Sequence, residues 1–447
     1  MLVALLIYVA FLLGVGIYTG FKEKDYDSFV VAGRSRSQTL VFLSLMATMI
    51  GGSATFGIAT TGMSIGFPAI WWLGVGTIGL ILQSLFVSAK VRDFNAYTLA
   101  DIGRITVGEG ARLAICIIIA VSWLGVIAGQ FVALSQIFAV ITGNGDNAWL
   151  LAVVALAVVA FTATGGQLSV MRTDAVQFFV LFFGIAVAFF FLHFGSGSMG
   201  MNTDYLGSIQ WFNESFTPAN LFYLLFVVGG AYFIGPDVLS RSMAAKDGKA
   251  ARGASMIAAF VLLIFNFLIV GLSIWCKNNL TDLQGMNPLV YIMEHRLPMI
   301  LAFILALGLV SALLSSASTC LITTASIIQN DIIRKKSMRS VRLLVCVVGV
   351  VATLIALVKK DIIAILTGAY SVYAPGVVFP LFLAIWFYKK RPIHQGCWLL
   401  AVAAGGCCGL IGNFISFYWL PMIGMALSLV LGIVSLVIGN KTADVDK

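Results

Sequence analysis

The sequence has 447 residues, of which 60% are hydrophobic and only 10% are charged, and its mean hydropathy is +1.03. Charged residues make up about a quarter of a typical soluble protein, so this composition excludes an ordinary soluble protein and favours a membrane protein. The formal net charge of +9 would suggest a nucleic-acid partner only if the basic residues clustered for that purpose.

Apolar stretches recur along the whole chain, and about 20 such residues are enough for a helix to cross a bilayer. They predict thirteen spans, at residues 1–19, 38–61, 67–89, 111–141, 147–164, 172–193, 219–240, 251–276, 297–330, 340–358, 362–387, 396–414 and 417–438.

Basic residues are distributed unevenly around these spans. If the N-terminus lies outside, all but four of the 27 Lys and Arg residues fall on the inner side, the exceptions being Lys277, Arg296, Lys359 and Lys360. This is the positive-inside bias of multi-pass proteins, so the charge reflects topology and does not indicate nucleic acid. We expect a plasma or inner cell membrane protein with its N-terminus outside and its C-terminus in the cytoplasm.

Two expected spans carry residues that interrupt a helix. The second span contains Gly51 and Gly52, and the seventh contains a glycine pair followed by Pro236. Glycine weakens a helix, and proline lacks the N–H and clashes with the preceding turn. If residues 38–193 and 219–387 form two five-span repeats, the two interruptions fall at equivalent positions within them. Because each repeat then has an odd number of spans, the two repeats lie in the bilayer in opposite orientations. Paired interruptions mark the midplane site of transporters, although glycine pairs also allow close helix packing.

Asp174 and Asp237 are the acidic residues that fall near the inner ends of expected spans. An ionisable group in a span predicts a function, because hydrocarbon does not solvate it. Arg241 follows Asp237 by four residues, so an ion pair along one helix is the expected role of Asp237. Asp174 has no partner at that spacing and is the stronger candidate for a site.

Hydroxyl groups line one face of the ninth span. With 3.6 residues per turn, that face carries Ser311, Ser315, Ser318 and Thr319. Ser316 stands about 100° around the helix from Ser315. Hydroxyls, with the carbonyls freed at Ala47 and Ile50 by the interrupted span, are suitable ligands for an alkali cation, and Asp174 would supply a countercharge. Such a stripe is also typical of helix packing.

Residues 165–177, GGQLSVMRTDAVQ, resemble the signature of the sodium/solute symporter family, a double glycine followed by Ala/Ser-Val, Thr-Asp and Gln. Further segments agree with that family in order and spacing, at residues 31–35, 97–101, 240–246 and 373–376. The resemblance covers essentially residues 1–390. It implies a single membrane domain over residues 1–447 with the LeuT-type fold: an all-α integral membrane protein of about 13 transmembrane helices, a five-plus-five inverted repeat, one extra helix before it (1–19) and two after it (396–414 and 417–438).

The resemblance also implies the ligands of sodium. The site common to the family would comprise the carbonyls of Ala47, Ile50 and Ala312 with the hydroxyls of Ser315 and Ser316. Some relatives hold a second sodium nearer the cytoplasm, and that pattern is matched by Asp174, Ser315, Ser318 and Thr319. One or two sodium ions are therefore expected.

Departures from the family narrow the solute. Sugar carriers place Glu-Gln where this chain has Ser53-Ala54, and sialic acid carriers place an Arg on the fourth span, which has none between 113 and 143. The seventh span resembles the proline branch, which however has Asp where this chain has Met49. The resemblance implies a cavity without a fixed charge, lined by Ser53, Phe56, Trp72, Gln130, Tyr232, Thr367 and Tyr370, although each aromatic residue singly is as well explained by packing.

Together these features predict a sodium-coupled symporter that imports a small organic solute by alternating access, with an amino acid or a small carboxylate favoured. A carrier of sugars, nucleobases or vitamins and a transporter-like sensor are the alternatives. An enzyme is disfavoured, because the three histidines lie far apart in the sequence and no catalytic motif occurs. The expected partners are the solute and the lipid bilayer, and the sequence indicates no oligomeric state.

Overall fold

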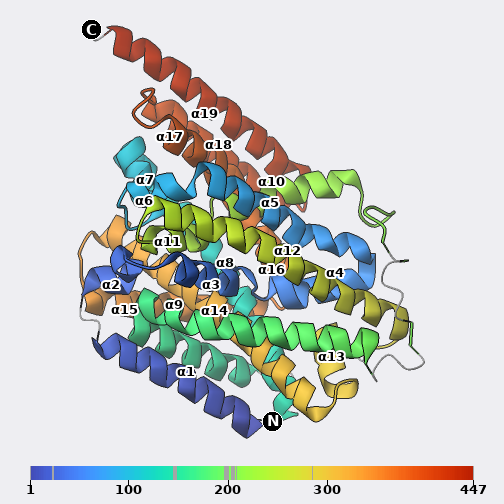
Figure 1. Ribbon diagram of the computed structural model, residues 1–447. Coiled ribbons are helices and arrows are strands. Elements are labelled where there is room, and N and C mark those ends of the chain that lie inside the picture. Colours follow the sequence, from blue (N-terminus) through green and yellow to red (C-terminus); the bar gives the residue numbers. More distant parts are fainter. Residues whose placement is uncertain are drawn as a thin grey trace.

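Helices form nearly all the regular structure of this protein, as Figure 1 shows. The structure is a computed structural model, and it describes residues 2–22, 25–143, 148–195, 201, 202, 207, 209–283 and 285–445. Strand pairing within these residues is limited to two isolated bridges. The helices are α1 (Leu2–Lys22), α2 (Tyr26–Val31), α3 (Gln38–Met49), α4 (Ile58–Ile65), α5 (Trp71–Phe86), α6 (Ser88–Asp93), α7 (Leu99–Thr106), α8 (Glu109–Thr142), α9 (Ala148–Phe194), α10 (Pro218–Phe233), α11 (Pro236–Ala244), α12 (Gly248–Asn279), α13 (Pro288–His295), α14 (Met299–Ile327), α15 (Met338–Val358), α16 (Ile362–Tyr373), α17 (Phe379–Phe387), α18 (Gln395–Phe414) and α19 (Trp419–Val445). Short 3-10 or π turns are η1 (Ala32–Arg34), η2 (Ser53–Gly57), η3 (Phe67–Ile70), η5 (Ile328–Ile333) and η6 (Ala374–Val378).

Ten helices of the described chain are long and apolar enough to cross a membrane, and a bent pair brings the number to eleven. The long helix α9 covers two of the expected spans, 147–164 and 172–193, although residue 147 itself lies outside the described residues. Inside α9, Gly166 leaves helical geometry with φ of 66°, and a side chain there would collide with Phe29. The multi-pass helical class is confirmed, while the exact number of thirteen stays a prediction.

The first expected interruption separates α3 from α4. Ser37 caps α3 by accepting the N–H of Leu40, and the helix ends at Ile50, which has φ of −96° and ψ of 72°. The chain resumes through the π turn η2, and the two halves are bent by 57°. The glycine pair lies in this gap, where the backbone must leave helical geometry.

The second expected interruption separates α10 from α11. Ile234 ends α10 with φ of −133° and ψ of 68°, and Pro236 lies in the first turn of α11. A proline is tolerated there because the N–H it lacks would have no helical partner. The freed carbonyl of Ile234 accepts a hydrogen bond from the Tyr373 hydroxyl of α16, which replaces the helical partner that this carbonyl lacks.

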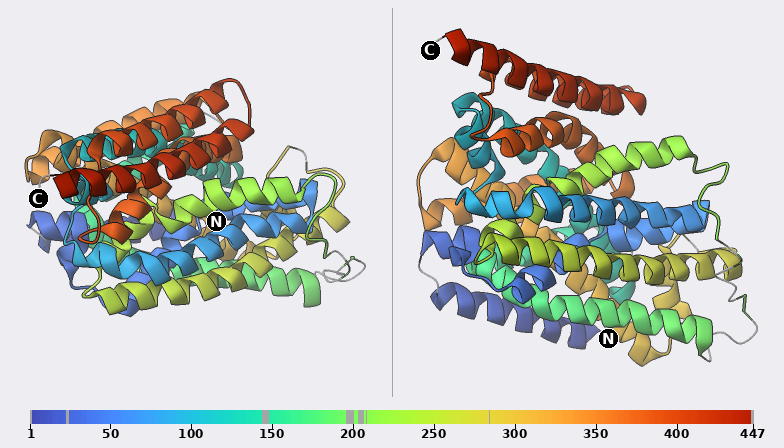
Figure 2. Two further views of the ribbon diagram at one scale, coloured as in Figure 1. Left: turned by 90° about the horizontal axis from the view of Figure 1, so that it is seen from above. Right: turned by 45° about the horizontal axis from the view of Figure 1, so that its top comes forward.

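Helices α9 and α14 pack along each other through the middle of the molecule. Helix α1 packs on α9 at one flank, and α18 and α19 pack on each other at the opposite flank, as Figures 1 and 2 show. The start of α1 and the end of α19 lie at opposite ends of the bundle (Figure 1). Helix α1 and the pair formed by α18 and α19 therefore cover separate sides of the bundle.

Loops that carry many of the basic residues meet at one end of the bundle, which we name the basic end. Arg92 Nε donates to the carbonyl of Ala245 at 2.5 Å, and Arg34 Nη2 donates to that of Ala96 at 3.2 Å. At the opposite end, Lys277 donates to the carbonyl of Ser64 at 3.1 Å. These contacts bring basic segments from different parts of the sequence together at the basic end.

Candidate ion and solute site

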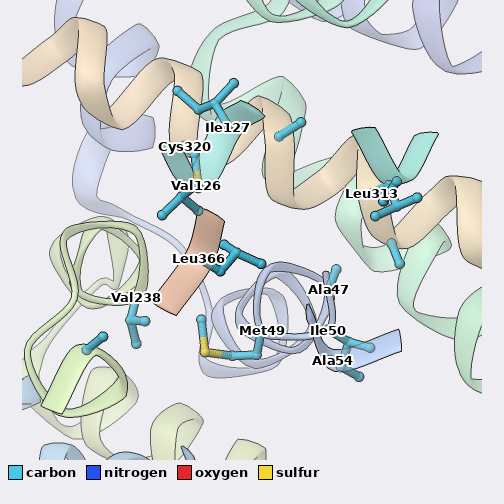
Figure 3. Packing of buried hydrophobic residues seen from close by; sticks show 14 of the residues in the cluster. Ala47, Met49, Ile50, Ala54, Val126, Ile127, Val238, Leu313, Cys320 and Leu366 are labelled. Atoms are coloured by element: carbon cyan, nitrogen blue, oxygen red, sulfur yellow. The ribbon is translucent and has the colours of Figure 1, made fainter. Parts of the chain in front are cut away.

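The interrupted end of α3 lies against the hydroxyl-bearing face of α14. Ser316 Oγ donates to the carbonyl of Thr48 at 2.9 Å. The contact is so close that a Cβ on Gly51 would lie 2.6 Å from Ser316 Oγ, which only glycine allows. Figure 3 shows buried hydrophobic residues of this region, with Ala47 and Ile50 on the interrupted helix and Leu313 on α14. All three residues expected to offer carbonyls are fully buried here, namely Ala47, Ile50 and Ala312.

Local backbone geometry explains why carbonyl oxygens are available at this break. The N–H of Gly52 donates to Gln130 Oε1 at 2.7 Å instead of to a carbonyl one turn back. The helical ladder resumes where Thr55 N–H donates to the Gly51 carbonyl at 3.1 Å. Over the described residues, the carbonyls of Ala47 and Ile50 receive no backbone hydrogen bond from beyond the break. Such released carbonyls, beside hydroxyls, are hard ligands suited to a cation.

Asp174 of α9 forms a buried ion pair with Arg241 of α11. The Nη2–Oδ2 distance is 3.0 Å, and neither side chain is exposed. The hydroxyls of Ser44 and Ser315 each donate to this carboxylate at 2.5 Å. Arg241 also donates to Ser44 Oγ at 3.0 Å and to the Thr319 hydroxyl. A buried pair with these additional bonds offsets much of its desolvation cost.

The expected ion pair between Asp237 and Arg241 is wrong. Although the i,i+4 spacing permits it, the Arg241 side chain crosses to Asp174 on α9. Asp237 instead lines the central cavity, so the expectation that the cavity holds no fixed charge is also wrong. The physical reason is that α11 is a short helix packed against α3, α6, α12 and α14, where the long Arg241 side chain reaches the buried carboxylate of Asp174 on another element.

Two of the residues expected around a second sodium contact the Arg241 guanidinium. Asp174 and Thr319 both bond to it, while Ser315 bonds to the other carboxylate oxygen. Ser318 Oγ is buried and has no hydrogen-bond partner within the described part of the chain. A positively charged group thus already lies among these oxygens.

A central cavity of about 30 Å³ lies beside the break in α3. A water molecule needs roughly 10–15 Å³ of such volume, so side chains must move before a larger solute enters. The cavity is lined by Thr48, Met49, Gly51, Ser53, Trp123, Val126, Gln130, Ala231, Tyr232, Asp237, Val238, Ser316, Cys320 and Tyr370. Four of the expected solute residues are among them: Ser53, Gln130, Tyr232 and Tyr370.

The other expected solute residues lie elsewhere. Phe56 lines a wider vestibule of about 660 Å³ at the end opposite the basic one. Trp72 and Thr367 line neither space, and the Thr367 hydroxyl donates to its own helix at Ile363. The sequence reasoning missed Trp123 and Asp237 as lining residues, although the position of Asp237 directly after Pro236 was a signal that it lies at a helix break.

Hydrogen bonds close the basic end beneath the cavity, and we name them the basic-end network. Tyr97 OH donates to Asp27 at 2.7 Å, and Lys336 donates to the Tyr97 oxygen at 2.8 Å. Thr98 donates to Asp331 at 2.6 Å. Burial raises the pKa of the Tyr97 phenol, and the bond to Tyr97 raises the pKa of the Lys336 ammonium. Tyr97 therefore stays neutral and Lys336 stays charged at physiological pH.

Comparison with known proteins shows which family and which relatives this chain resembles. The model of the "Sodium:solute symporter family" matches residues 29–399. The chain is 26% identical to the high-affinity choline transporter 1 of Caenorhabditis elegans, over 92% of this chain and 77% of that protein. It is 25% identical to the osmoregulated proline transporter of Bacillus subtilis, over 92% of this chain and 88% of that protein.

Solved structures show the same architecture. The outward-open, substrate-bound structure of a Na⁺-coupled sialic acid symporter matches with a TM-score of 0.77 and 18% identity, over 97% of each chain. A nucleobase-cation-symport-1 transporter in a closed conformation matches with a TM-score of 0.68 and 14% identity, over 93% of this chain and 95% of that one. These likenesses confirm the predicted all-helical LeuT-type fold.

Proposed function

The chain belongs to the sodium:solute symporter family, and we propose that sodium entering through it drives the import of a small organic solute by alternating access. Its family and relatives are multi-pass membrane transporters, so the chain is a carrier and not an enzyme. By the positive-inside rule, we place the basic end in the cytoplasm. The N-terminus would then lie outside the cell and the C-terminus in the cytoplasm.

The observation that carries the proposal is the contact between the unwound end of α3 and the hydroxyls of α14. The ligands proposed for sodium are the carbonyls of Ala47, Ile50 and Ala312 with the hydroxyls of Ser315 and Ser316. Support comes from the Ser316–Thr48 bond of 2.9 Å, which fixes the register of the two helices. A cation bound between them would hold the break of α3 against α14 and so favour one of the two transport states.

We propose one sodium per cycle at this site. Of the second set, Asp174, Ser315, Ser318 and Thr319, two residues, Asp174 and Thr319, bond to Arg241, whose guanidinium is permanently charged. A second cation would have to displace Arg241 from a fully buried carboxylate. One sodium moving inward at 100 mV contributes about 2.3 kcal/mol, which supports roughly 50-fold accumulation before the sodium concentration gradient is added.

The solute is proposed to bind in the central cavity beside the sodium, where Ser53, Gln130, Tyr232 and Tyr370 would contact it. Relatives carry choline and proline by name, and we favour a solute of amino-acid size. The vestibule would admit it from outside while the basic-end network keeps the inner end shut. Rocking of the interrupted helices would then open the inner end.

Uptake of radiolabelled solutes into proteoliposomes tests the proposal. We expect saturable uptake that requires an inward sodium gradient and that potassium does not support. The dependence on sodium concentration should be hyperbolic with a Hill coefficient near one. Uptake that is equal with sodium and potassium would refute sodium coupling, and a coefficient near two would refute the single ion.

A further inference from the structure

Asp237 places a carboxyl group at the central cavity. It lies in the first turn of α11, directly after the break at Pro236, and its side chain lines the cavity. The residue is only 9% exposed. An ionisable group at this depth in a membrane protein is costly unless it is paired or has a function in transport. What pairs with Asp237 is therefore informative about the solute, if the proposed function holds.

The charge of Arg241, one turn along the helix, attracts the Asp237 carboxylate but does not form an ion pair with it. No Lys or Arg nitrogen of the described residues forms a salt bridge with it, and Arg241, one turn away, bonds to Asp174 at 3.0 Å. The backbone N–H groups at Asp237 and Val238 face the carboxylate, and the positive end of α11 favours it. These dipoles stabilise the carboxylate without cancelling its charge, which stays directed at the cavity.

Aromatic rings form the walls around this carboxylate. Tyr232 and Tyr370 line the same cavity, and so does Trp123, whose ring centre is 6.3 Å from that of Tyr370. Tyr373 supports the wall from behind, with its ring 4.7 Å from Trp123. Faces of tryptophan and tyrosine attract cations, including quaternary ammonium groups. An anion would gain nothing from them and would be repelled by Asp237.

We propose that the transported solute carries a positively charged nitrogen, and that this nitrogen pairs with Asp237 between Trp123, Tyr232 and Tyr370. The proposal rests on the proposed symport function and narrows its solute class. It retains amino acids and organic ammonium compounds and excludes simple carboxylates and sugars. Gln130 uses its Oε1 on the Gly52 N–H, so its amino group is left to bind an oxygen of the solute.

Pairs of probes that differ only in charge test this on the native protein in nanodiscs. Thermal stability is measured in sodium and in potassium with choline against its uncharged carbon isostere 3,3-dimethylbutan-1-ol, and with L-proline against cyclopentanecarboxylate. We expect sodium-dependent stabilisation by choline, L-proline or both, and none by either isostere. The proposal would be overturned if an isostere stabilised the protein as well as its charged partner does, or if neither choline nor L-proline stabilised it.

Variants then assign the effect to the carboxylate. Asp237→Asn should lower the apparent affinity for the stabilising amine by at least about tenfold, because one partner of a buried charge pair is lost. Asp237→Glu should retain part of it, and the exposed acid variant Asp25→Asn should retain all of it. If Asp237→Asn folds poorly, Asp237→Glu and the isostere pairs still test the proposal. Equal affinity for a charged probe and its isostere would contradict an ion pair between the solute nitrogen and Asp237.

Stabilisation by sodium in the absence of solute distinguishes a failure of this proposal from a failure of the proposed function. Stabilisation by sodium without solute should be the same in Asp237→Asn as in the native chain. If Asp237→Asn loses that stabilisation, Asp237 serves the ion and the solute proposal is wrong. If the native chain shows no stabilisation by sodium under any condition, sodium symport itself fails, whatever the amines do.

Discussion

Ser315 and Ser316 are neighbours in sequence but bond to different elements. Ser316 donates to the carbonyl of Thr48 at the break of α3, whereas Ser315 donates to Asp174 on α9. One turn of α14 therefore joins the interrupted helix to the buried ion pair. Because each hydroxyl keeps free lone pairs after donating, both can still accept a cation.

Ser316→Ala should raise the sodium concentration for half-maximal uptake roughly tenfold, because loss of one oxygen ligand and its hydrogen bond costs about 1–1.5 kcal/mol. Folding should be unaffected, since alanine fits the space. Thr324→Val is the matched control, because the Thr324 hydroxyl is buried on the same helix without a partner in the described structure. Sodium-dependent uptake measured for both variants checks this, and equal sodium requirements would remove Ser316 from the ligands.

Residue pairing across the bundle was only partly predictable. The glycine pair and the serine stripe point to an oxygen-rich junction, and the family resemblance connects them. The partner of Arg241 could not be deduced, because i,i+4 spacing favours Asp237 whereas tertiary packing brings Asp174 closer. The charge in the cavity was missed for the same reason, since Asp237 was assigned to a pair that does not form.

Among the elements, the gap between α3 and η2 depends on the absence of a side chain at Gly51. Gly51→Ala would place a Cβ 2.6 Å from Ser316 Oγ and 2.9 Å from Gln130 Oε1. Overpacking of this kind costs about 1–3 kcal/mol, so we expect α14 to be pushed from the break and uptake to fall at least about tenfold.

Gly14→Ala is the control for that substitution, because no atom lies within 4 Å of a Cβ built there in α1. Transport rates and expression levels of the two variants are compared in the same membranes. Normal sodium-dependent uptake by Gly51→Ala would show that close contact at the break is dispensable.

Helix α11 is fastened to α9 by the Asp174–Arg241 pair, which predicts non-additive stability. Arg241→Met should destabilise the protein by about 3–5 kcal/mol, because it leaves a buried charge unpaired, whereas adding Asp174→Asn should restore much of the loss. Melting temperatures in detergent measure this, with the exposed Arg252→Met as control. Additive effects of the two substitutions would contradict direct pairing.

The positions of helix breaks were more predictable than the boundaries of spans. Glycine pairs and Pro236 fixed both interruptions because their effect on a helix is local. The break inside α9 was also predicted, since residues 165 and 166 lie between the spans expected at 147–164 and 172–193, and the backbone leaves helical geometry at Gly166. Whether residues 38–193 and 219–387 are inverted repeats stays a prediction.

For the whole molecule, the vestibule of about 660 Å³ faces the end opposite the basic one. Toward the basic end, a small space of about 20 Å³ is lined by Tyr97, Pro236 and Ser326, and a space of about 340 Å³ lies around Tyr97, Asp331 and Lys336. The basic-end network joins the segment before α3, the loop before α7 and the loop before α15. The hydrogen bonds of this network would have to break before the solute could leave the cavity at the basic end.

Tyr97→Phe removes the bonds to Asp27 and Lys336 but keeps the ring, and should shift the population toward the inward-open state roughly fivefold, for a loss of about 1 kcal/mol. Maleimide labelling of Ser326→Cys, which lines the small inner space, reports this in a background without other cysteines. Tyr388→Phe is the control, and labelling that is unchanged by Tyr97→Phe would exclude the network as a gate.

The bond from Ser315 to Asp174 has a consequence for discrimination among alkali metals. Because the Ser315 hydroxyl donates its hydrogen bond to Asp174 Oδ1, its lone pairs are held in one direction, and an ion at the proposed site would meet an oxygen that cannot rotate freely. A cage of fixed size favours sodium over the larger potassium. Neutralising Asp174 would thus relax metal selectivity, although that carboxylate need never touch the bound metal.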